Sequence, residues 1–512
     1  MTTGRASRTE ARRFIDDLER RLAPLDRHIL LAEWKLVTGR SMRGSATDQT
    51  RRHRLLSFPG TLERIRQLRE GCPPGPLQRR LELAARAVLE SQIEQTAEIV
   101  QRRARLQRAI AGYRPRWHGR RTGRAIVRAA LRTSEDRRER ERAFYAEEPL
   151  YRPIEADLVS LVAARNDRAR ELGYRSFPEY RLSMEGFTVP RLEVLMEDAL
   201  RFVPREMRRR REQFEDRTHE RGWYPWDLRF AEEQERRLPD TAFPGGTMFP
   251  AIVAGIRRWG FPPSAFHFRV DRHDLAVGGL CLAPDPPKDV RVVIQPAGGW
   301  SQYRVLFHEV GHALSSRSIR QPTSHLLRWH EGIPGFAGLA EGEGRFFEQI
   351  ASSERWLRER PGLPSEHREA AIENERRAPL QTLAWLAGWV QQELTLYLHP
   401  DRDPVESGVR FARRLFGYDR YRGPPFANSF VVEAPLYSPS YVYAELLRPA
   451  LNAALREEVG GELWPNARVG PWLVRHWFRD GTSFDWWTRL RELTGRPFGA
   501  GPFNAEMRKF TE

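Results

Sequence analysis

Hydrophobic and polar residues follow a helical period over the first 150 positions of the chain. Apolar residues recur three or four positions apart among arginine and glutamate, for example at Phe14, Leu18 and Leu22. Proline-containing breaks at 72–76 and 113–115 interrupt the pattern. It therefore predicts a series of helical hairpins, and the lack of a fixed-length repeat argues against a solenoid.

The helical period continues after position 150, and two short segments differ from it. Phe266 to Val270 alternates between apolar and polar residues, and Val290 to Ile294 is a β-branched run followed by Pro296 and two glycines, so both predict strands. Further helices are predicted at 159–202, 249–259, 303–316, 340–351, 380–398 and 441–457. The chain is thus predicted to be mainly α-helical, with a small β element directly before the helix at 303–316.

The composition is that of a folded protein. Of the 512 residues, 40% are hydrophobic and 11% aromatic, which excludes a disordered chain. No segment approaches the roughly 20 apolar residues of a membrane span, and no signal-peptide core is visible, so we expect a cytoplasmic protein without a membrane partner. Only Cys72 and Cys281 are present, so any metal must be held by histidine and carboxylates.

The net charge of +17 raises the possibility of nucleic-acid binding. However, lysine occurs at only three positions, and the arginines are interleaved with glutamate, as in the segment 137–142. Such mixing is typical of solvated helix faces with pairs four residues apart. The distribution therefore disfavours a nucleic-acid partner.

The most informative segment is Phe307 to Leu314, which reads FHEVGHAL. Residues four apart share one face of a helix, so the imidazoles of His308 and His312 can reach one zinc ion at about 2.0 to 2.1 Å. Glu309 then leans toward the open coordination position, where a carboxylate can take a proton from water. The segment predicts a zinc site with Glu309 as general base; the alternative is a structural helix without metal.

A catalytic zinc site needs a third protein ligand. The downstream candidates are Glu331, Glu341, Glu343 and Glu348. If 339–349 is helical, Glu341 and Glu348 share a face that Glu343 does not, and Glu331 lies in a Gly/Pro-rich turn. This pattern ranks Glu341 first, with Glu348 orienting a histidine ligand through its other ring nitrogen.

Several segments occur together in a recognisable order. They are Arg165-Asn166 with 172–182, Pro225-Trp226-Asp227, Asp289-Val290-Arg291 before the HEVGH helix, and the Glu341 to Glu348 run. Together they resemble the α-helical zinc peptidases that include thimet and bacterial oligopeptidases, angiotensin-converting-enzyme-like dipeptidases and Taq-type carboxypeptidases. The resemblance covers roughly 161–498 and implies Glu341 as the third ligand.

The segment from Tyr437 to Glu445, YSPSYVYAE, extends this resemblance. In those families a tyrosine-rich segment faces the metal and its phenols donate to the oxyanion, which implies this role for Tyr441 first and Tyr437 second. The alternative is aromatic packing at a helix start. The families also carry a histidine several residues earlier, where this chain has Ser429, Val432 and Glu433.

The resemblance implies a two-lobed helical zincin with a deep substrate channel and a small sheet beside the HExxH helix. Residues 1–150 would form an N-terminal helical lobe or lid and 151–512 the catalytic region, and we expect the two to form one continuous structural unit. We expect one zinc ion per chain and hydrolysis of peptide bonds in short, unfolded oligopeptides, because a narrow channel excludes folded proteins.

Two alternatives remain open from the sequence. The same fold could act at the C-terminus, as a metallocarboxypeptidase or peptidyl-dipeptidase, which would require an arginine or lysine to hold the substrate carboxylate; the sequence has too many arginines to nominate one. The chain could instead be a catalytically weak scaffold that binds anionic partners through its arginine surface. The oligomeric state has no signature in the sequence.

Overall fold

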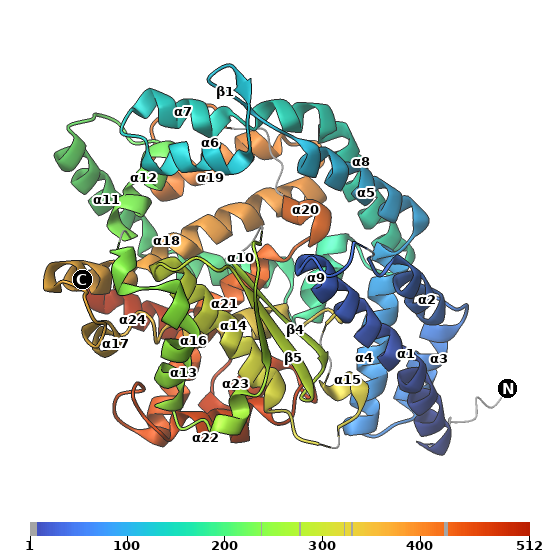
Figure 1. The fold of residues 1–512 in the computed structure, drawn as a ribbon. Coiled ribbons are helices and arrows are strands. Elements are labelled where there is room, and N and C mark those ends of the chain that lie inside the picture. The colour runs from blue at the N-terminus through green and yellow to red at the C-terminus, as the bar shows by residue number, and fades with distance from the viewer. Residues whose placement is uncertain are drawn as a thin grey trace.

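The computed structural model describes residues 8–42, 44–236, 238–275, 278–321, 323–328, 331–423 and 429–511. Most of these residues are helical, and the strands are few and short, which confirms the mainly α-helical prediction (Figure 1). No helix in the described ranges is both long and apolar enough to cross a membrane.

The helices before the central sheet begin with a long N-terminal helix and follow one another through short turns. They are α1 (Arg8–Val37), α2 (Ala46–Leu56), α3 (Thr61–Glu70), α4 (Pro76–Glu94), α5 (Ala97–Gly112), α6 (Arg124–Thr133), α7 (Arg137–Tyr145), α8 (Glu148–Glu171), α9 (Phe177–Met184), α10 (Val189–Ala199), α11 (Val203–Thr218), α12 (Pro225–Arg236) and α13 (Met248–Arg257). Two-residue strands β1 (Arg116–Trp117) and β2 (Arg120–Arg121) form a tight hairpin between α5 and α6.

The helices after the sheet include those that carry the predicted site residues. They are α14 (Trp300–Arg317), α15 (His325–Arg328), α16 (Ala337–Glu348), α17 (Glu354–Arg358), α18 (Ser365–Leu398), α19 (Pro404–Phe416), α20 (Ser429–Glu433), α21 (Ser438–Val459), α22 (Val469–Leu473), α23 (Trp486–Thr494) and α24 (Gly501–Thr511).

Three strands form the main sheet, in the order β3 (Arg269–Arg272), β5 (Asp289–Ile294) and β4 (Gly279–Asp285). The central strand β5 pairs in parallel with β3 and antiparallel with β4. Helix α14 packs against β4 and β5, so the predicted small sheet does lie beside the HEVGH helix.

Two details of this sheet differ from the sequence prediction. Strand β4 was not predicted, because its segment begins with glycines, which are normally poor strand residues. The predicted strand at 266–270 is wrong in its first half: a short 3-10 turn occupies Pro263–Phe266 and the strand begins only at Arg269. Pro262 and Pro263 hold the turn, since proline fixes φ near the value that turns require.

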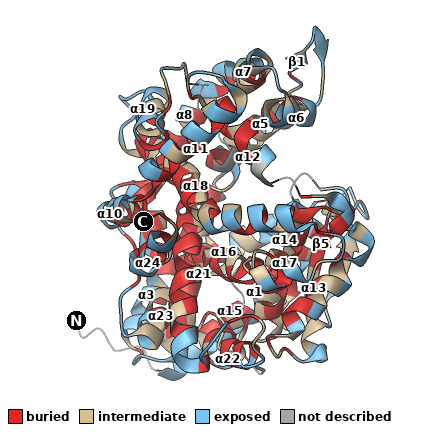
Figure 2. Ribbon diagram, turned by 90° about the vertical axis from the view of Figure 1, so that its left-hand side faces the viewer, coloured by how far each residue is buried: buried red, intermediate tan, exposed pale blue. Residues whose placement is uncertain are grey.

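The molecule has two lobes (Figures 1 and 2). One contains α5 to α8, α11, α12 and α19; the other contains the sheet, α13 to α16 and α21 to α24. Helix α18 runs between them and packs against α19 in the first lobe and α21 in the second. Helix α16 packs between α14 and α21, and these three helices carry the predicted site residues.

The N-terminal helix is attached to the sheet of the second lobe. Helix α1 packs against β4, and Trp34 donates a hydrogen bond from Nε1 to Asp271 Oδ2 at 2.9 Å. The guanidinium groups of Arg269 and Arg291 lie 4.6 and 4.1 Å from the Trp34 ring centroid. The first helix of the chain is therefore attached to the sheet that lies beside α14, while the assignment of 1–150 as a lid stays a prediction.

Candidate metal centre

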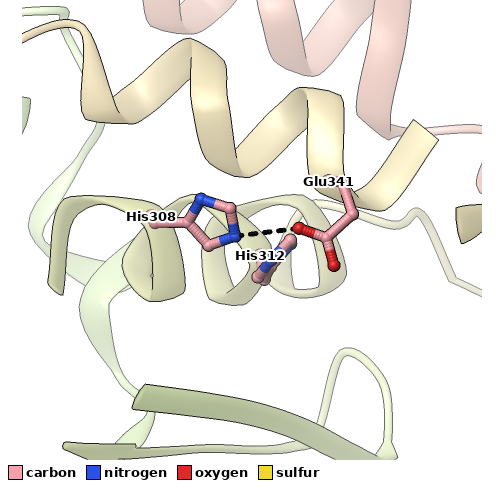
Figure 3. Close-up of side chains that lie close together, drawn as sticks. All are labelled: His308, His312 and Glu341. Carbon is pink, nitrogen blue, oxygen red and sulfur yellow. Dashed lines mark ion pairs between the residues drawn. The ribbon is translucent and has the colours of Figure 1, made fainter. Parts of the chain in front are cut away.

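His308 and His312 lie one turn apart on α14, with ring centroids separated by 4.6 Å. The opposite face of the helix is anchored by buried residues such as Leu306, Val310 and Leu314. This anchoring leaves the two imidazoles on the side that faces α16, as the spacing predicted (Figure 3).

Glu341 on α16 completes a group of three possible metal ligands. Its Oε2 lies 3.3 Å from His308 Nε2, and one ligand atom each from His308, His312 and Glu341 all lie within 4.8 Å of one another (Figure 3). Two imidazoles and a carboxylate are a donor set that suits zinc and leaves a fourth position open. The residues present therefore fit a catalytic zinc site.

Glycines allow the two ligand-bearing helices to approach closely. A Cβ at Gly344 would lie 2.5 Å from His308 Nε2, and a Cβ at Gly311 would lie 2.9 Å from the Phe347 ring. Both distances are shorter than a side chain tolerates. The glycines in HEVGH and in EGEGRFFE thus permit the contact between α14 and α16 that brings Glu341 to the histidines.

Contacts between the candidate ligands shift their pKa values. Burial alone would lower the pKa of His308, but hydrogen bonds to Glu341 and Glu348 outweigh it and raise that pKa to about 10. Burial opposes ionisation of Glu341, yet its hydrogen bond with His308 lowers its pKa to about 2. The protein thus holds a carboxylate where a cation is favoured, and a metal would displace the imidazole proton.

Glu348 contacts the other side of the His308 ring. Its Oε2 lies 3.7 Å from His308 Nδ1, and its carboxylate is held by Arg304 at 2.6 Å and Arg345 at 2.7 Å. Burial opposes its ionisation, but the two arginines hold the pKa of Glu348 well below its usual range. This is the position that the helix period predicted for a residue orienting a ligand.

Glu309 is buried on α14 beside strand β4. A Cβ at Gly279 would lie only 2.7 Å from Glu309 Cγ, so the strand can pass this close only because glycine occupies the position. Burial raises the pKa of Glu309 to about 7, although the neighbouring His308 partly offsets this effect. Such a pKa is suitable for a group that accepts and returns a proton near neutral pH.

The two predicted tyrosines lie at the start of α21, and both interact with Glu341. Tyr437 donates a hydrogen bond from its hydroxyl to Glu341 Oε1 at 2.7 Å, and the rings of Tyr437 and Tyr441 pack edge to face with centroids 5.3 Å apart. Tyr437 therefore holds the third candidate ligand, a contact that the sequence did not predict.

A cavity of about 490 Å³ contains all six predicted site residues. His308, Glu309, His312, Glu341, Tyr437 and Tyr441 all line it. Of the other candidate ligands, Glu331 and Glu343 also line this cavity, whereas Glu348 lines a separate cavity of about 500 Å³ behind α16.

Several lining residues were missed in the sequence. Glu90, Arg181 and Glu185 come from helices far upstream, and Gly279 and Cys281 come from the unpredicted strand β4. The Gly278-Gly279 pair was the one available signal, since paired glycines before a strand can mark a close approach. Residues 431–433 of α20 do not line the cavity, and the side chain of Ser429 lies outside the described residues.

No protein-family model and no curated protein sequence matches the chain. Solved structures do share its fold. Trypanosoma cruzi metallocarboxypeptidase 1 has a TM-score of 0.66 at 15% identity, covering 97% of this chain and 99% of that one. A Pyrococcus furiosus carboxypeptidase has a TM-score of 0.69 at 14% identity, covering 98% and 99%.

A further structure with this fold is not titled a carboxypeptidase. PZ peptidase A, solved with an inhibitor, has a TM-score of 0.68 at 15% identity, covering 100% of this chain and 98% of that one. At such low identity these likenesses show a common helical fold over the whole chain.

Proposed function

We propose that the chain is a zinc-dependent peptidase in which His308, His312 and Glu341 bind one metal ion. The observation that carries this proposal is the convergence of three ligand atoms within 4.8 Å beside Glu309, in a cavity of about 490 Å³. The carboxypeptidases and the peptidase that share the fold support peptide bonds as the substrate.

When bound, zinc supplies a Lewis acid that polarises the scissile carbonyl and acidifies water. Glu309 takes the proton from the attacking water on a carboxylate oxygen and returns it to the leaving amine. The hydroxyl of Tyr441 donates to the carbonyl oxygen as negative charge develops there. Tyr437 and Glu348 act through the ligands: Tyr437 orients Glu341, and Glu348 orients His308.

We further propose short, unfolded oligopeptides as substrates, because the candidate site lies in a cavity and not on an open surface. Removal of residues from the C-terminus is the second candidate. It is favoured by two neighbours in fold that are carboxypeptidases.

Metal analysis of the purified protein, combined with a peptide-library digest read by mass spectrometry, tests both modes. We expect one zinc ion per chain, and cleavage that disappears in Glu309→Gln while the zinc remains. Products shortened only from the C-terminus would assign the carboxypeptidase mode. Absence of both zinc and cleavage would contradict the proposal and favour the scaffold alternative.

A further inference from the structure

One long segment of the chain carries arginines without any acidic residue. Between Glu98 and Glu135 there are eleven arginines and no aspartate or glutamate. Six of them form ion pairs with carboxylates outside the segment: Arg102, Arg103, Arg105, Arg124, Arg128 and Arg132. Within the described part of the chain, no ion pair joins the other five to a carboxylate: Arg108, Arg114, Arg116, Arg120 and Arg121. Because arginine stays protonated at physiological pH, these five positive charges lack a counter-charge.

Four of these five arginines line one cavity. The cavity has a volume of about 610 Å³ and lies in the first lobe, where the end of α5, the β1–β2 hairpin and the junction of α7 and α8 meet. Figure 1 shows the hairpin at the end of this lobe that is remote from α14 and α16. No carboxylate is found among the described lining residues, which include Arg108, Arg114, Arg116, Arg121, Tyr113 and Tyr145.

The hairpin places two of the lining arginines directly opposite each other. Arg116 and Arg121 are partners in the antiparallel register of β1 and β2, and the Thr122 amide donates to the Pro115 carbonyl at 2.9 Å. Side chains paired in this way have Cβ atoms about 4.5 to 5.5 Å apart, so two like charges repel. An anion bound between the two guanidinium groups would replace this repulsion by attraction.

The other groups around the cavity leave its positive charge unbalanced. Arg114 donates to two main-chain carbonyl groups at 2.9 Å, which carry no net charge. Two glutamates at the junction of α7 and α8 are already bound to arginines that do not line the cavity. Arg124 donates to Glu147 at 2.8 Å, and Arg422 donates to Glu148 at 2.7 Å. A ligand with negative charge would therefore meet four guanidinium groups without competition from a lining carboxylate.

We propose that this cavity binds a small ligand with several phosphate groups, of the size of an inorganic or nucleoside triphosphate. A guanidinium group binds two phosphate oxygens through parallel hydrogen bonds, and four such groups match the roughly four negative charges of a triphosphate. The volume also lies in the range of small-molecule sites, about 300 to 1,000 Å³. The cavity belongs to the first lobe and the candidate metal centre to the second, so this inference does not depend on the peptidase proposal.

Calorimetry of the full chain with inorganic tripolyphosphate tests the site. We expect one site per chain, with an affinity at least about tenfold higher than that for orthophosphate, and a loss of about tenfold in Arg121→Gln, which removes one bidentate contact. Arg120→Gln is the matched control. Arg120 is exposed in the same hairpin and has no carboxylate partner among the described residues, but it does not line the cavity. Its loss should change the affinity by less than about twofold.

Two more measurements separate a built site from general attraction by charge. Arg121→Lys keeps the charge but not the planar fork, so it should restore only part of the lost affinity. Tripolyphosphate should raise the unfolding temperature of the wild type and of Arg120→Gln more than that of Arg121→Gln. Equal weakening by Arg120→Gln and Arg121→Gln would show that only the overall charge matters and would overturn the proposal, as would the absence of binding to the wild type.

Further ligands identify the source of the phosphate groups. Tighter binding of a nucleoside triphosphate than of tripolyphosphate would assign a nucleotide, and equal binding would assign the phosphate chain alone; both results support the cavity as the site. A single-stranded RNA oligonucleotide that binds more tightly than either, and is weakened equally by Arg120→Gln and Arg121→Gln, would assign a nucleic-acid surface over the whole hairpin. That result would overturn the assignment to a small ligand.

Discussion

Glu348 and Glu341 contact the two nitrogens of the same imidazole: Glu348 Oε2 lies 3.7 Å from His308 Nδ1, and Glu341 Oε2 lies 3.3 Å from Nε2. The His308 ring thus lies between two carboxylates. Glu341 would bind the same metal ion as His308, whereas Glu348 would contact only the ring. Because α16 supplies both acids, the position of this one helix sets the orientation of His308.

Replacement of Glu348 by glutamine should weaken zinc binding about 10- to 100-fold, because the partner on the second nitrogen orients the ring and raises its basicity. Competition with a chelator measures the affinity. Glu462→Gln serves as the control. Glu462 is exposed and lines the same 500 Å³ cavity as Glu348, so this variant should bind zinc as the wild type does. An unchanged affinity in Glu348→Gln would show that His308 needs no such support.

Substitution of Gly344 by alanine should destabilise the fold and reduce zinc content, since the new Cβ would lie 2.5 Å from His308 Nε2. Overpacking of this kind costs about 1 to 3 kcal/mol. The matched control is Gly388→Ala in helix α18, where the nearest atom would lie 4.0 Å away and alanine should stabilise the helix by up to about 1 kcal/mol. Thermal unfolding and metal analysis of both variants would measure these differences in stability and zinc content. Equal unfolding temperatures and equal zinc content in the two variants would contradict the prediction.

The two tyrosines should separate metal binding from catalysis. Both hydroxyls interact with Glu341, and the bond from Tyr437 is 2.7 Å long, so Tyr437→Phe should lower zinc affinity more than Tyr441→Phe does. Tyr441→Phe should instead lower kcat by about 10²-fold, the usual effect of losing one oxyanion donor. Chelator competition and steady-state kinetics on both variants distinguish these outcomes. A normal kcat in Tyr441→Phe would exclude its hydroxyl from the reaction.

The shifted pKa of Glu393, a residue outside the candidate metal centre, predicts that the stability of the fold depends on pH. It is buried in α18, accepts a hydrogen bond from the Leu436 amide at 2.6 Å, and its pKa is raised to about 7 by burial despite the nearby Arg165 and Arg181. The pKa of Glu393 is higher in the folded protein than in the unfolded chain. Its contribution to the free energy of unfolding is therefore complete below about pH 4.5 and is lost as the pH rises through about 7.

The variant Glu393→Gln keeps an acceptor for Leu436 without the charge. Compared with the wild type, it should unfold at a higher temperature at pH 8, while the difference should shrink toward pH 5, where the wild-type carboxyl is neutral in the folded state. Unfolding measured across this range provides the check. A difference independent of pH would show that Glu393 stays ionised in the folded protein.

The parts of the site that depend on helical period could be predicted from the sequence. The four-residue spacing of His308 and His312 and the shared face of Glu341 and Glu348 follow from geometry within single helices. The contact of Tyr437 with Glu341 spans 96 residues, and Arg181 reaches the cavity from much farther upstream. Such contacts depend on how helices pack, which local patterns do not specify.

Strand β4 was missed for a related reason. Gly278 and Gly279 predict a turn by local rules, but here they allow the strand to pass beside Val305 and Glu309, where Cβ atoms would lie 2.9 and 2.7 Å from those side chains. The glycine pair signals a close approach, but the neighbour that requires it, helix α14, is identified only in the folded arrangement. The roles assigned to individual site residues stay predictions that the variants above can test.

The hydrogen bond from Trp34 to Asp271 joins residues 237 positions apart. During synthesis, α1 can pack against α2, α3 and α4 soon after it is made, but its contacts with the sheet form only after about 230 further residues have been added. Tyr437 and Tyr441 are made later still. A nascent chain that ends before these residues therefore cannot form the complete cavity. Contacts between residues so far apart in sequence form late and slowly, so the unfinished chain exposes apolar surface that chaperones can bind.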